Sequence, residues 1–343
     1  MVNTEDTTKS GLSTKAKLLI MLREAEGKPV SGSKLAAELG VSRVAVWKGI
    51  QTLSSAGYPV DTQDTGYSLD PAQVNDFLYP WEFGEKEAMF RHFANTGSTM
   101  DRVREFAVQG HGAGLTVIAE RQSAGRGRNG RTWNSRNGGL FCTILDRPKI
   151  TMADYCLPVM LYQIAAARAL GSVCGKPASL RWPNDIYINR RKIAGLLAEL
   201  AGEGDSVSWL GMGIGINVNN QVPLERAASC ASILGHQVSR RDVLLGIFDE
   251  AERLRKEVIS GNAYSQGNRL LADRWNSIAD CMGAKAAVID SASADTAKNR
   301  VLAKGIFAGV DPSGRCIIKS EEGKGAWYFN PGPVSVVFLS GRQ

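Results

Sequence analysis

The chain has 343 residues, of which 43% are hydrophobic and 22% are charged, so it can bury a core and form two or three globular domains. The net charge of +7 favours anionic ligands without indicating nucleic acid by itself, and the spacing of the six Cys and three His argues for reduced thiols and against zinc. No run of 18 apolar residues and no secretory signal are present, so we expect a cytoplasmic protein without a membrane span.

Residues 1–70 have the pattern of a winged helix-turn-helix domain. A helical run, KAKLLIMLREAE, precedes a short helix that Gly40 stops and a second helix that Ser42 caps. Two short strands follow around an Asp-Thr-Gly turn in YPVDTQDTGYSL. In this arrangement the second helix enters the major groove of DNA.

The second helix has one apolar and one polar face. Val46, Ile50 and Leu53 repeat at helical spacing and predict the inward face. Arg and Gln can hydrogen-bond base edges, Lys can reach phosphate, and Trp can touch a thymine methyl. The residues that we expect to contact DNA are Ser42, Arg43, Trp47, Lys48 and Gln51. Residues 1–70 hold eight Lys/Arg and eight Asp/Glu, so a helical interaction domain that binds no DNA is the alternative.

After a linker that contains Pro71 and Pro80, residues 80–278 have the pattern of a mixed sheet domain. GLTVIAE, GGLFCTIL and KIAGLLAEL are typical of strands with buried faces. YCLPVMLYQIAAARALGSVCG predicts a long apolar helix, and DVLLGIFDEAERLRKEV predicts an amphipathic one. We therefore expect a central α/β or α+β domain within a multidomain α+β protein.

One loop of this domain, QSAGRGRNGRTWNS at 122–135, carries Arg126, Arg128 and Arg131 separated by glycines. It lies between two predicted strands, and a long loop inside a compact domain usually has a function. Glycine lets the backbone approach a ligand, and arginine binds phosphate with two donors. The loop therefore predicts a lid over a phosphorylated ligand, with a solvated surface loop as the alternative.

A second segment whose residues could take part in binding or catalysis is LRWPNDIYINRRKIAGLLAEL. Pro183 presets φ and Asn184–Asp185 favours a bend, so WPND predicts a turn, which a plain tight hairpin would also explain. Lys192 opens a buried strand, a costly position unless an anion meets it. Gly195 in that strand indicates close approach by a ligand or by backbone.

The third such segment is WLGMGIGINVN. Gly211, Gly213 and Gly215 alternate and therefore share one face of a strand, whereas the intervening residues from Met212 to Val218 occupy the packed face. A face without side chains leaves room for a flat ligand or for a closely packed helix, and both readings stay open. The spacing is not GxGxxG, so a dinucleotide fold is not supported.

Residues 279–343 have the pattern of five short strands, with DPSG and EEGKG as turns. Short strands joined by tight turns predict a small β-barrel. Three domains are thus expected, over 1–70, 80–278 and 279–343.

The motifs GRGRNGR, RWPNDIYI, KIAGLLAEL and GMGIGINVN, in this order, closely resemble those of the bacterial biotin protein ligases. The winged helix resembles that of the bifunctional members, which also repress the biotin operon. The last segment resembles their SH3-like C-terminal domain.

This resemblance implies the activity of a biotin–[biotin carboxyl carrier protein] ligase. Biotin and ATP, with Mg²⁺, would form biotinyl-5′-AMP, and a lysine of the carrier protein would then take the biotinyl group. The adenylate must be protected from water, which suits a closing loop. The resemblance also implies a homodimer that forms on adenylate binding and represses at operator DNA, with no metal ligand assigned in the chain.

The same resemblance implies site residues. Those for biotin are Ser98, Thr99, Met100, Gln122, Arg126, Gly127, Arg128, Lys192 and Gly195. Those for ATP and the adenylate are Arg128, Arg131, Trp133, Asn184, Lys192 and Asn217. The catalytic residues are Lys192, which would bridge the biotin carboxylate and the α-phosphate, Arg126, and Asp185, which would help to deprotonate the acceptor lysine.

Three positions depart from the family pattern. Arg181 replaces the usual Lys before WPND, Met100 replaces an amide so that only its backbone offers polar contacts, and NPGPVSV at 330–336 replaces a Gly-Glu-Val-Ser pattern. No ATP contact is therefore assigned to 330–336. The alternatives are a lipoate ligase or octanoyltransferase of the same central fold, and a biotin ligase whose winged helix does not bind DNA. A repressor without catalysis is opposed by Lys192 and the loop.

Overall fold

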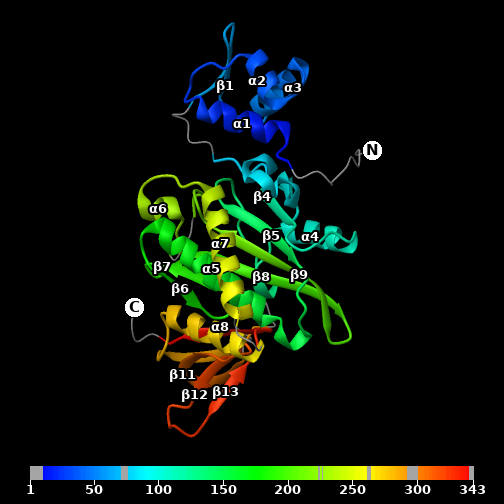
Figure 1. Cartoon of the computed structure of the whole chain (residues 1–343). Coiled ribbons are helices and arrows are strands. Elements are labelled where there is room, and N and C mark those ends of the chain that lie inside the picture. The colour runs from blue at the N-terminus through cyan, green and yellow to red at the C-terminus, as the bar shows by residue number, and fades with distance from the viewer. Residues whose placement is uncertain are drawn as a thin grey trace. The chain divides into compact units, whose positions relative to one another are not determined.

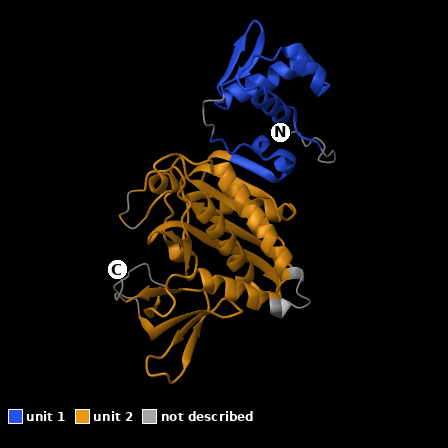
Figure 2. Ribbon diagram, turned by 60° about the vertical axis from the view of Figure 1, so that its left-hand side comes forward, with its two compact units in different colours: residues 1–92 blue, residues 93–343 orange. Residues whose placement is uncertain are grey.

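The computed structural model describes residues 11–70, 76–222, 225, 227–260, 264–291 and 300–339. The chain divides into two compact units, Met1–His92 and Phe93–Gln343 (Figures 1 and 2). The predicted boundary at residue 70 thus differs from the edge of the first unit, and the expected second and third domains lie in one unit. Each difference has a cause in side-chain packing.

The N-terminal unit contains three helices and a two-stranded wing. The helices are α1 (Thr14–Glu24), α2 (Gly32–Leu39) and α3 (Arg43–Ser55), and the strands are β1 (Val60–Gln63) and β2 (Gly66–Leu69). A serine side chain caps each helix N-terminus, and Gly40 ends α2 in the left-handed conformation. The antiparallel pairing of β1 with β2 completes the winged helix-turn-helix fold, which confirms the prediction.

The segment after the wing belongs to the first unit because it packs on that unit's core. Phe77, Tyr79 and Trp81 contact the core, and the 3₁₀ segment η1 (Pro80–Met89) follows. The Glu82 side chain is 1% exposed and accepts from the Arg23 guanidinium at 2.9 Å. It also accepts from the Tyr58 hydroxyl at 2.6 Å. Pro71, part of the expected linker, lies outside the described residues.

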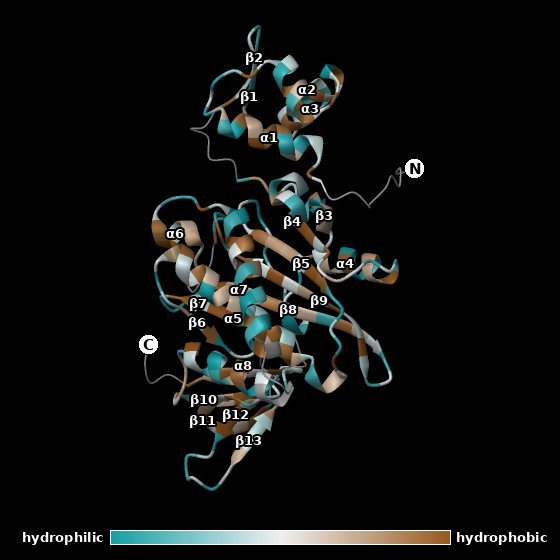
Figure 3. Cartoon of the chain, in the orientation of Figure 1, coloured by the Kyte–Doolittle hydropathy of each residue, from teal (hydrophilic) through white to brown (hydrophobic). Residues whose placement is uncertain are grey.

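The second unit is built on a seven-stranded sheet of order β3-β4-β5-β9-β8-β7-β6. The strands are β3 (Phe90–Thr96), β4 (Thr116–Gln122), β5 (Leu140–Asp146), β6 (Ala178–Arg181), β7 (Asp185–Ile188), β8 (Arg191–Glu203) and β9 (Ser206–Ile216). The pairs from β4 to β6 along this order are antiparallel. Figure 3 shows β5 as hydrophobic along its length, in agreement with its buried side chains.

Helices flank this sheet (Figure 1). They are α4 (Thr99–Val108), α5 (Cys156–Cys174), α6 (Cys230–Leu234), α7 (Arg240–Ser260) and α8 (Tyr264–Ile278), with short 3₁₀ turns η2 (Arg128–Gly130) and η3 (Met152–Asp154). The predicted strands and both predicted long helices are therefore present.

Helix α5, together with the turn before it, is long and apolar enough to cross a membrane by length and composition. In the structure most of its side chains are buried, and it packs against α7 and α8. Its buried polar residue, Gln163, accepts from the Trp275 indole N–H and donates to the Pro183 carbonyl. These contacts are those of a core helix in a globular domain.

The C-terminal strands form a separate antiparallel sheet of order β13-β12-β11-β10-β14. They are β10 (Lys285–Asp290), β11 (Val301–Val310), β12 (Cys316–Lys319), β13 (Ala326–Phe329) and β14 (Val334–Phe338). Five strands were predicted, and the arrangement is consistent with an SH3-like domain. Hydrogen bonds join it to the seven-stranded sheet domain, among them Trp182 Nε1 to the Gly314 carbonyl at 3.1 Å and Tyr155 Oη to the Pro331 carbonyl at 2.7 Å.

Candidate active site

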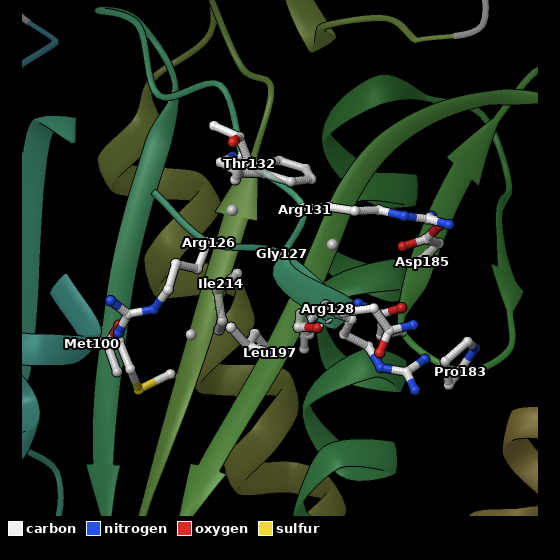
Figure 4. Close-up of a pocket in the computed structure, with 18 of the residues that line it drawn as sticks. Met100, Arg126, Gly127, Arg128, Arg131, Thr132, Pro183, Asp185, Leu197 and Ile214 are labelled. Carbon is white, nitrogen blue, oxygen red and sulfur yellow. Dashed lines mark hydrogen bonds between the residues drawn. The ribbon is translucent and has the colours of Figure 1, made fainter. Parts of the chain in front are cut away.

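A cavity of about 230 Å³ lies between loop 122–135, the start of α4 and the WPND turn (Figure 4), and β14 also contributes to its lining. It brings together predicted residues from distant parts of the second unit. Those that line it are Ser98, Thr99, Met100, Gln122, Arg126, Gly127, Arg128, Arg131, Trp133, Asn184, Asp185, Lys192 and Gly195. Asn217 is not among the lining residues, because its buried amide oxygen accepts from Asn220 Nδ2 at 3.0 Å beyond the end of β9.

One part of the cavity wall is a network of neutral polar groups. Gln122 Oε1 accepts from the backbone N–H of Thr99 at 2.8 Å and from its hydroxyl at 3.2 Å. Gln122 Nε2 donates to Ser135 Oγ at 2.8 Å, and the hydroxyls of Thr99 and Thr143 are 2.8 Å apart. Ser98 caps α4 through its hydroxyl. Such fixed, uncharged donors and acceptors suit a neutral polar group of a ligand.

Thr143 was missed in the sequence analysis. It lies opposite Gly213 in the antiparallel pairing of β5 with β9. In the sequence Thr143 is recognisable only as a hydroxyl among apolar residues of β5. The strand register is needed to show that this hydroxyl lies beside the glycine face of β9.

The glycine face of β9 accommodates two side chains of the protein itself. A Cβ added to Gly211 would lie 2.8 Å from Met100 Sδ, and one added to Gly215 would lie 2.6 Å from the Trp133 ring. The face therefore lets α4 pack closely at one end, and at the other end it holds the tryptophan of the loop against the cavity. Close packing, one of the two predicted readings, is thus present, and a flat ligand on this face stays a prediction.

Arg126, predicted as a catalytic residue, uses its guanidinium to anchor the loop. Its two terminal nitrogens donate to the Asp101 carboxylate at 2.9 and 2.7 Å, and Nη2 lies 3.4 Å from Glu199 Oε1. The hydrogen bond from Arg126 lowers the pKa of Asp101. The loop is thereby tied to α4 and to β8, so in this structure the charge of Arg126 is already paired.

Arg128 is a different case because it is largely buried, and this burial lowers its pKa. It donates to the backbone carbonyls of Gly332 and Val334. Within the described ranges neither Arg128 nor Arg131 has a carboxylate at ion-pair distance, and both line the cavity. They are therefore the loop cations that remain available to an anionic ligand.

Lys192 and Asp185, the other two predicted catalytic residues, form an ion pair. Their Nζ and Oδ1 atoms are 2.7 Å apart, and Lys192 Nζ lies 5.4 Å from the centre of the Trp133 ring. Strand pairing places Asp185 opposite Gly195. A Cβ added to Gly195 would lie 3.6 Å from Asp185 Oδ1 and 3.6 Å from Lys192 Cε, so the ion pair lies over this glycine beside the WPND turn. A carboxylate or phosphate entering the cavity would exchange with Asp185 as the partner of Lys192.

Asn184 and Arg181, in and before the WPND turn, use their side chains to bind other parts of the protein. Asn184 donates through its amide to the Leu196 carbonyl at 2.7 Å, which ties the turn to β8. Arg181, whose role the sequence left open, lies outside the cavity. It binds Asp280 at 3.1 Å and stacks on Tyr187 with 4.1 Å to the ring centre.

The C-terminal sheet contributes to the cavity through Ser335 and Val336, in the segment to which no ligand contact was assigned. Asn129 of the loop also lines the cavity. Ser335 and Val336 were not predicted because they come from a sheet that is distant in the sequence from the motifs, and Asn129 was not predicted because the phosphate contacts of the loop were assigned to its arginines.

The predicted DNA-reading surface lies in the other unit. Val46, Ile50 and Leu53 are buried, which confirms the inward face of α3. The candidate contact residues Ser42, Arg43, Trp47, Lys48 and Gln51 are exposed. Ser42 also caps α3 by accepting from the Ala45 N–H at 3.1 Å.

Comparison with known proteins gives matches in both units. Residues 93–219 match the Biotin/lipoate A/B protein ligase family, and residues 14–68 match an HTH domain family. The Bifunctional ligase/repressor BirA of Bacillus subtilis (strain 168) is 34% identical over 241 residues, which are 66% of this chain and 74% of that protein. The protein of the same description from Escherichia coli (strain K12) is 34% identical over 208 residues, covering 59% of this chain and 63% of that protein.

Among solved structures, one similar fold is the Biotin protein ligase from Aquifex aeolicus in complex with biotin and ATP. It has a TM-score of 0.60 and 26% identity, and the alignment covers 73% of this chain and 99% of that one. The family matches thus fall on the cavity-bearing sheet domain and on the winged helix-turn-helix.

Proposed function

Because the chain belongs to the biotin protein ligases, in the group that carries an N-terminal helix-turn-helix domain, we propose that it is an ATP-dependent biotin protein ligase that also represses transcription of biotin genes. The observation that carries the enzymatic proposal is the cavity, where a neutral polar wall, the Lys192–Asp185 pair and the loop cations meet. The solved structure named above is described as a biotin protein ligase in complex with biotin and ATP, which supports biotin as the acid.

In the first step, an oxygen of the biotin carboxylate bonds to the α-phosphorus of ATP, and the bond from that phosphorus to the pyrophosphate oxygen breaks. Both reactants are anionic, so their approach requires cations. Lys192 would bind the carboxylate and the α-phosphate together, and Arg128 and Arg131 would bind phosphate oxygens. Gln122 and Thr99 would hold the ureido ring at the other end of the cavity.

In the second step, the amine of a carrier-protein lysine attacks the carbonyl carbon of the adenylate, and AMP leaves. Asp185 is the candidate to accept the ammonium proton, since it lines the cavity beside Lys192. Loop 122–135, which contributes Trp133 to the wall, would limit the access of water to the mixed anhydride before transfer.

Mg²⁺ is part of this proposal as a companion of ATP. Within the described part of the chain no group of three or more His, Cys, Asp or Glu side chains gathers as a metal site. Mg²⁺ is commonly bound by one or two carboxylates together with substrate phosphates, and Asp185 is a cavity carboxylate that fits this pattern. The ion would neutralise phosphate charge.

The decisive experiment is exchange of labelled pyrophosphate into ATP. We expect exchange that requires biotin and Mg²⁺, and transfer of biotin to the lysine of a purified biotin carboxyl carrier domain. Lipoate at the same concentration should support no exchange. If biotin binds but exchange stays at the level of the enzyme-free blank, the ligase proposal is wrong.

The exposed face of α3 supports the second activity, repression at operator DNA in the cytoplasm. A single helix presenting Arg43, Lys48 and Gln51 makes few contacts, so tight binding needs two copies on a two-fold operator. We propose that formation of biotinyl-AMP promotes the homodimer and thereby operator binding. The coupling is reciprocal, so operator DNA should also tighten adenylate binding.

We expect gel shifts on DNA upstream of biotin genes to require the adenylate, with biotin alone or ATP alone giving weaker binding. Sedimentation of the apo, biotin-bound and adenylate-bound protein should show the dimer in the last state. Arg43→Ala should abolish the shift while leaving pyrophosphate exchange unchanged. Equal operator affinity in all three states would refute the switch without affecting the ligase proposal.

A further inference from the structure

The cationic loop is joined to the C-terminal sheet by a chain of three hydrogen-bonded side chains. Asn129 Nδ2 donates to Ser291 Oγ at 2.7 Å, and Ser335 Oγ donates to the same oxygen at 3.1 Å. Ser291 is 3% exposed, and its backbone N–H donates to the Pro333 carbonyl at 2.6 Å. The loop therefore meets the 330–336 segment through the buried Ser291 hydroxyl, whose oxygen accepts from both sides.

The backbone of Asn129 suits this contact. Its φ of 55° lies in the left-handed region, where asparagine is tolerated better than most residues. The turn around it is closed by Gly127 N–H to the Arg131 carbonyl at 2.7 Å and by Arg131 N–H to the Arg128 carbonyl at 3.2 Å. A constraint on Asn129 therefore also constrains the two neighbouring arginines.

Those two arginines are the loop cations without carboxylate partners within the described ranges, and Arg128 itself donates to carbonyls of the 330–336 segment. Ser335 lines the cavity together with Arg128 and Arg131. The C-terminal sheet thus contacts the loop at the turn that carries its available charges.

We propose that Asn129, Ser291 and Ser335 form a latch by which the C-terminal sheet holds the loop over the cavity. Asn129 is then a positioning residue, which acts through Arg128 and Arg131 and touches no reacting atom. This rests on the proposed ligase function for its kinetic consequence. The latch stabilises the loop conformation in which phosphate is held and the adenylate is shielded from water.

The test compares N129G, S291A and the double variant with the wild-type full-length chain. Glycine removes the amide without forcing another side chain into the left-handed conformation. We expect kcat for pyrophosphate exchange to fall, and hydrolytic loss of biotinyl-AMP without acceptor to rise, each roughly two- to tenfold, the range that one hydrogen bond supplies. The KM for biotin should stay within about twofold, because Gln122 and Thr99 are unchanged.

The double variant should be no more impaired than either single variant, since both remove the same contact. S320A is the matched control, because Ser320 accepts a hydrogen bond at a turn of the same sheet away from the cavity. It should behave as the wild type. A purely structural role would lower the melting temperature without changing the ratio of adenylate transferred to adenylate lost.

Limited trypsin digestion supplies a readout that needs no activity. Cleavage after Arg128 and Arg131 should be faster in N129G and S291A than in the wild type and S320A. Unchanged cleavage and an unchanged ratio of transfer to loss would overturn the latch. If the wild type made no adenylate, the ligase proposal would fail, whereas the digestion would still decide the latch.

Discussion

Lys192→Ala is expected to slow formation of the adenylate roughly ten- to a hundredfold, the worth of one charge-assisted hydrogen bond. In the ligand-free protein Lys192 pairs with Asp185 at 2.7 Å, and in the proposed reaction it would turn to the two reacting anions. Its removal raises their mutual repulsion and leaves the Asp185 carboxylate without its partner in the cavity. The measurement is biotin-dependent pyrophosphate exchange, together with the affinity for biotin and for the adenylate.

Two further variants separate the causes. Asp185→Asn removes both the residual carboxylate and the proposed Mg²⁺ ligand, so partial recovery of exchange in Lys192→Ala with Asp185→Asn would show that repulsion by Asp185 outweighs its contribution to Mg²⁺ binding. Lys285→Ala is the control for loss of a lysine, since Lys285 pairs with Glu321 on the C-terminal sheet at an exposed position. Exchange at the wild-type rate in Lys192→Ala would remove this residue from the site.

The second large effect is expected in the N-terminal unit, where Glu82→Ala should lower the free energy of unfolding by about 3 kcal/mol. The substitution leaves the buried Tyr58 hydroxyl without its acceptor and Arg23 without its partner. The value is at the low end for a broken buried ion pair because the Arg23 side chain is 36% exposed. Hydrogen exchange of the backbone amides of α1 to α3 across a series of urea concentrations measures it, because these amides report on the N-terminal unit alone.

The matched comparison is Lys34→Ala, which removes an exposed pair with Glu38 on α2 and should change stability by less than about 0.5 kcal/mol. Glu82→Gln should lie between these two variants, because its amide oxygen can still accept from Tyr58. A Glu82→Ala protein as stable as the Lys34→Ala protein would show that the 76–92 segment is not held by this contact.

The sequence by itself determined the helix-turn-helix, the long helices α5 and α7, the glycine-lined strand β9 and the motifs. The repeat of Val46, Ile50 and Leu53 defined the buried face of α3, and the alternation of Gly211, Gly213 and Gly215 defined the open face of β9. Such patterns are readable because backbone geometry repeats every 3.6 residues in a helix and every two in a strand. The order of the loop, WPND and the Lys192 strand then indicated the family and half of the cavity-lining residues.

Only the tertiary structure decided which charges are already paired and which segments meet. Arg126 binds Asp101 and Glu199, whereas Arg128 and Arg131 have no carboxylate partner within the described ranges, although one loop supplies all three arginines. Ser335 reaches the cavity from the C-terminal sheet. These partners are far apart in the sequence, and strand register and loop path bring them together. Such contacts cannot be predicted from a local sequence pattern, because they form only when both partners reach their folded positions.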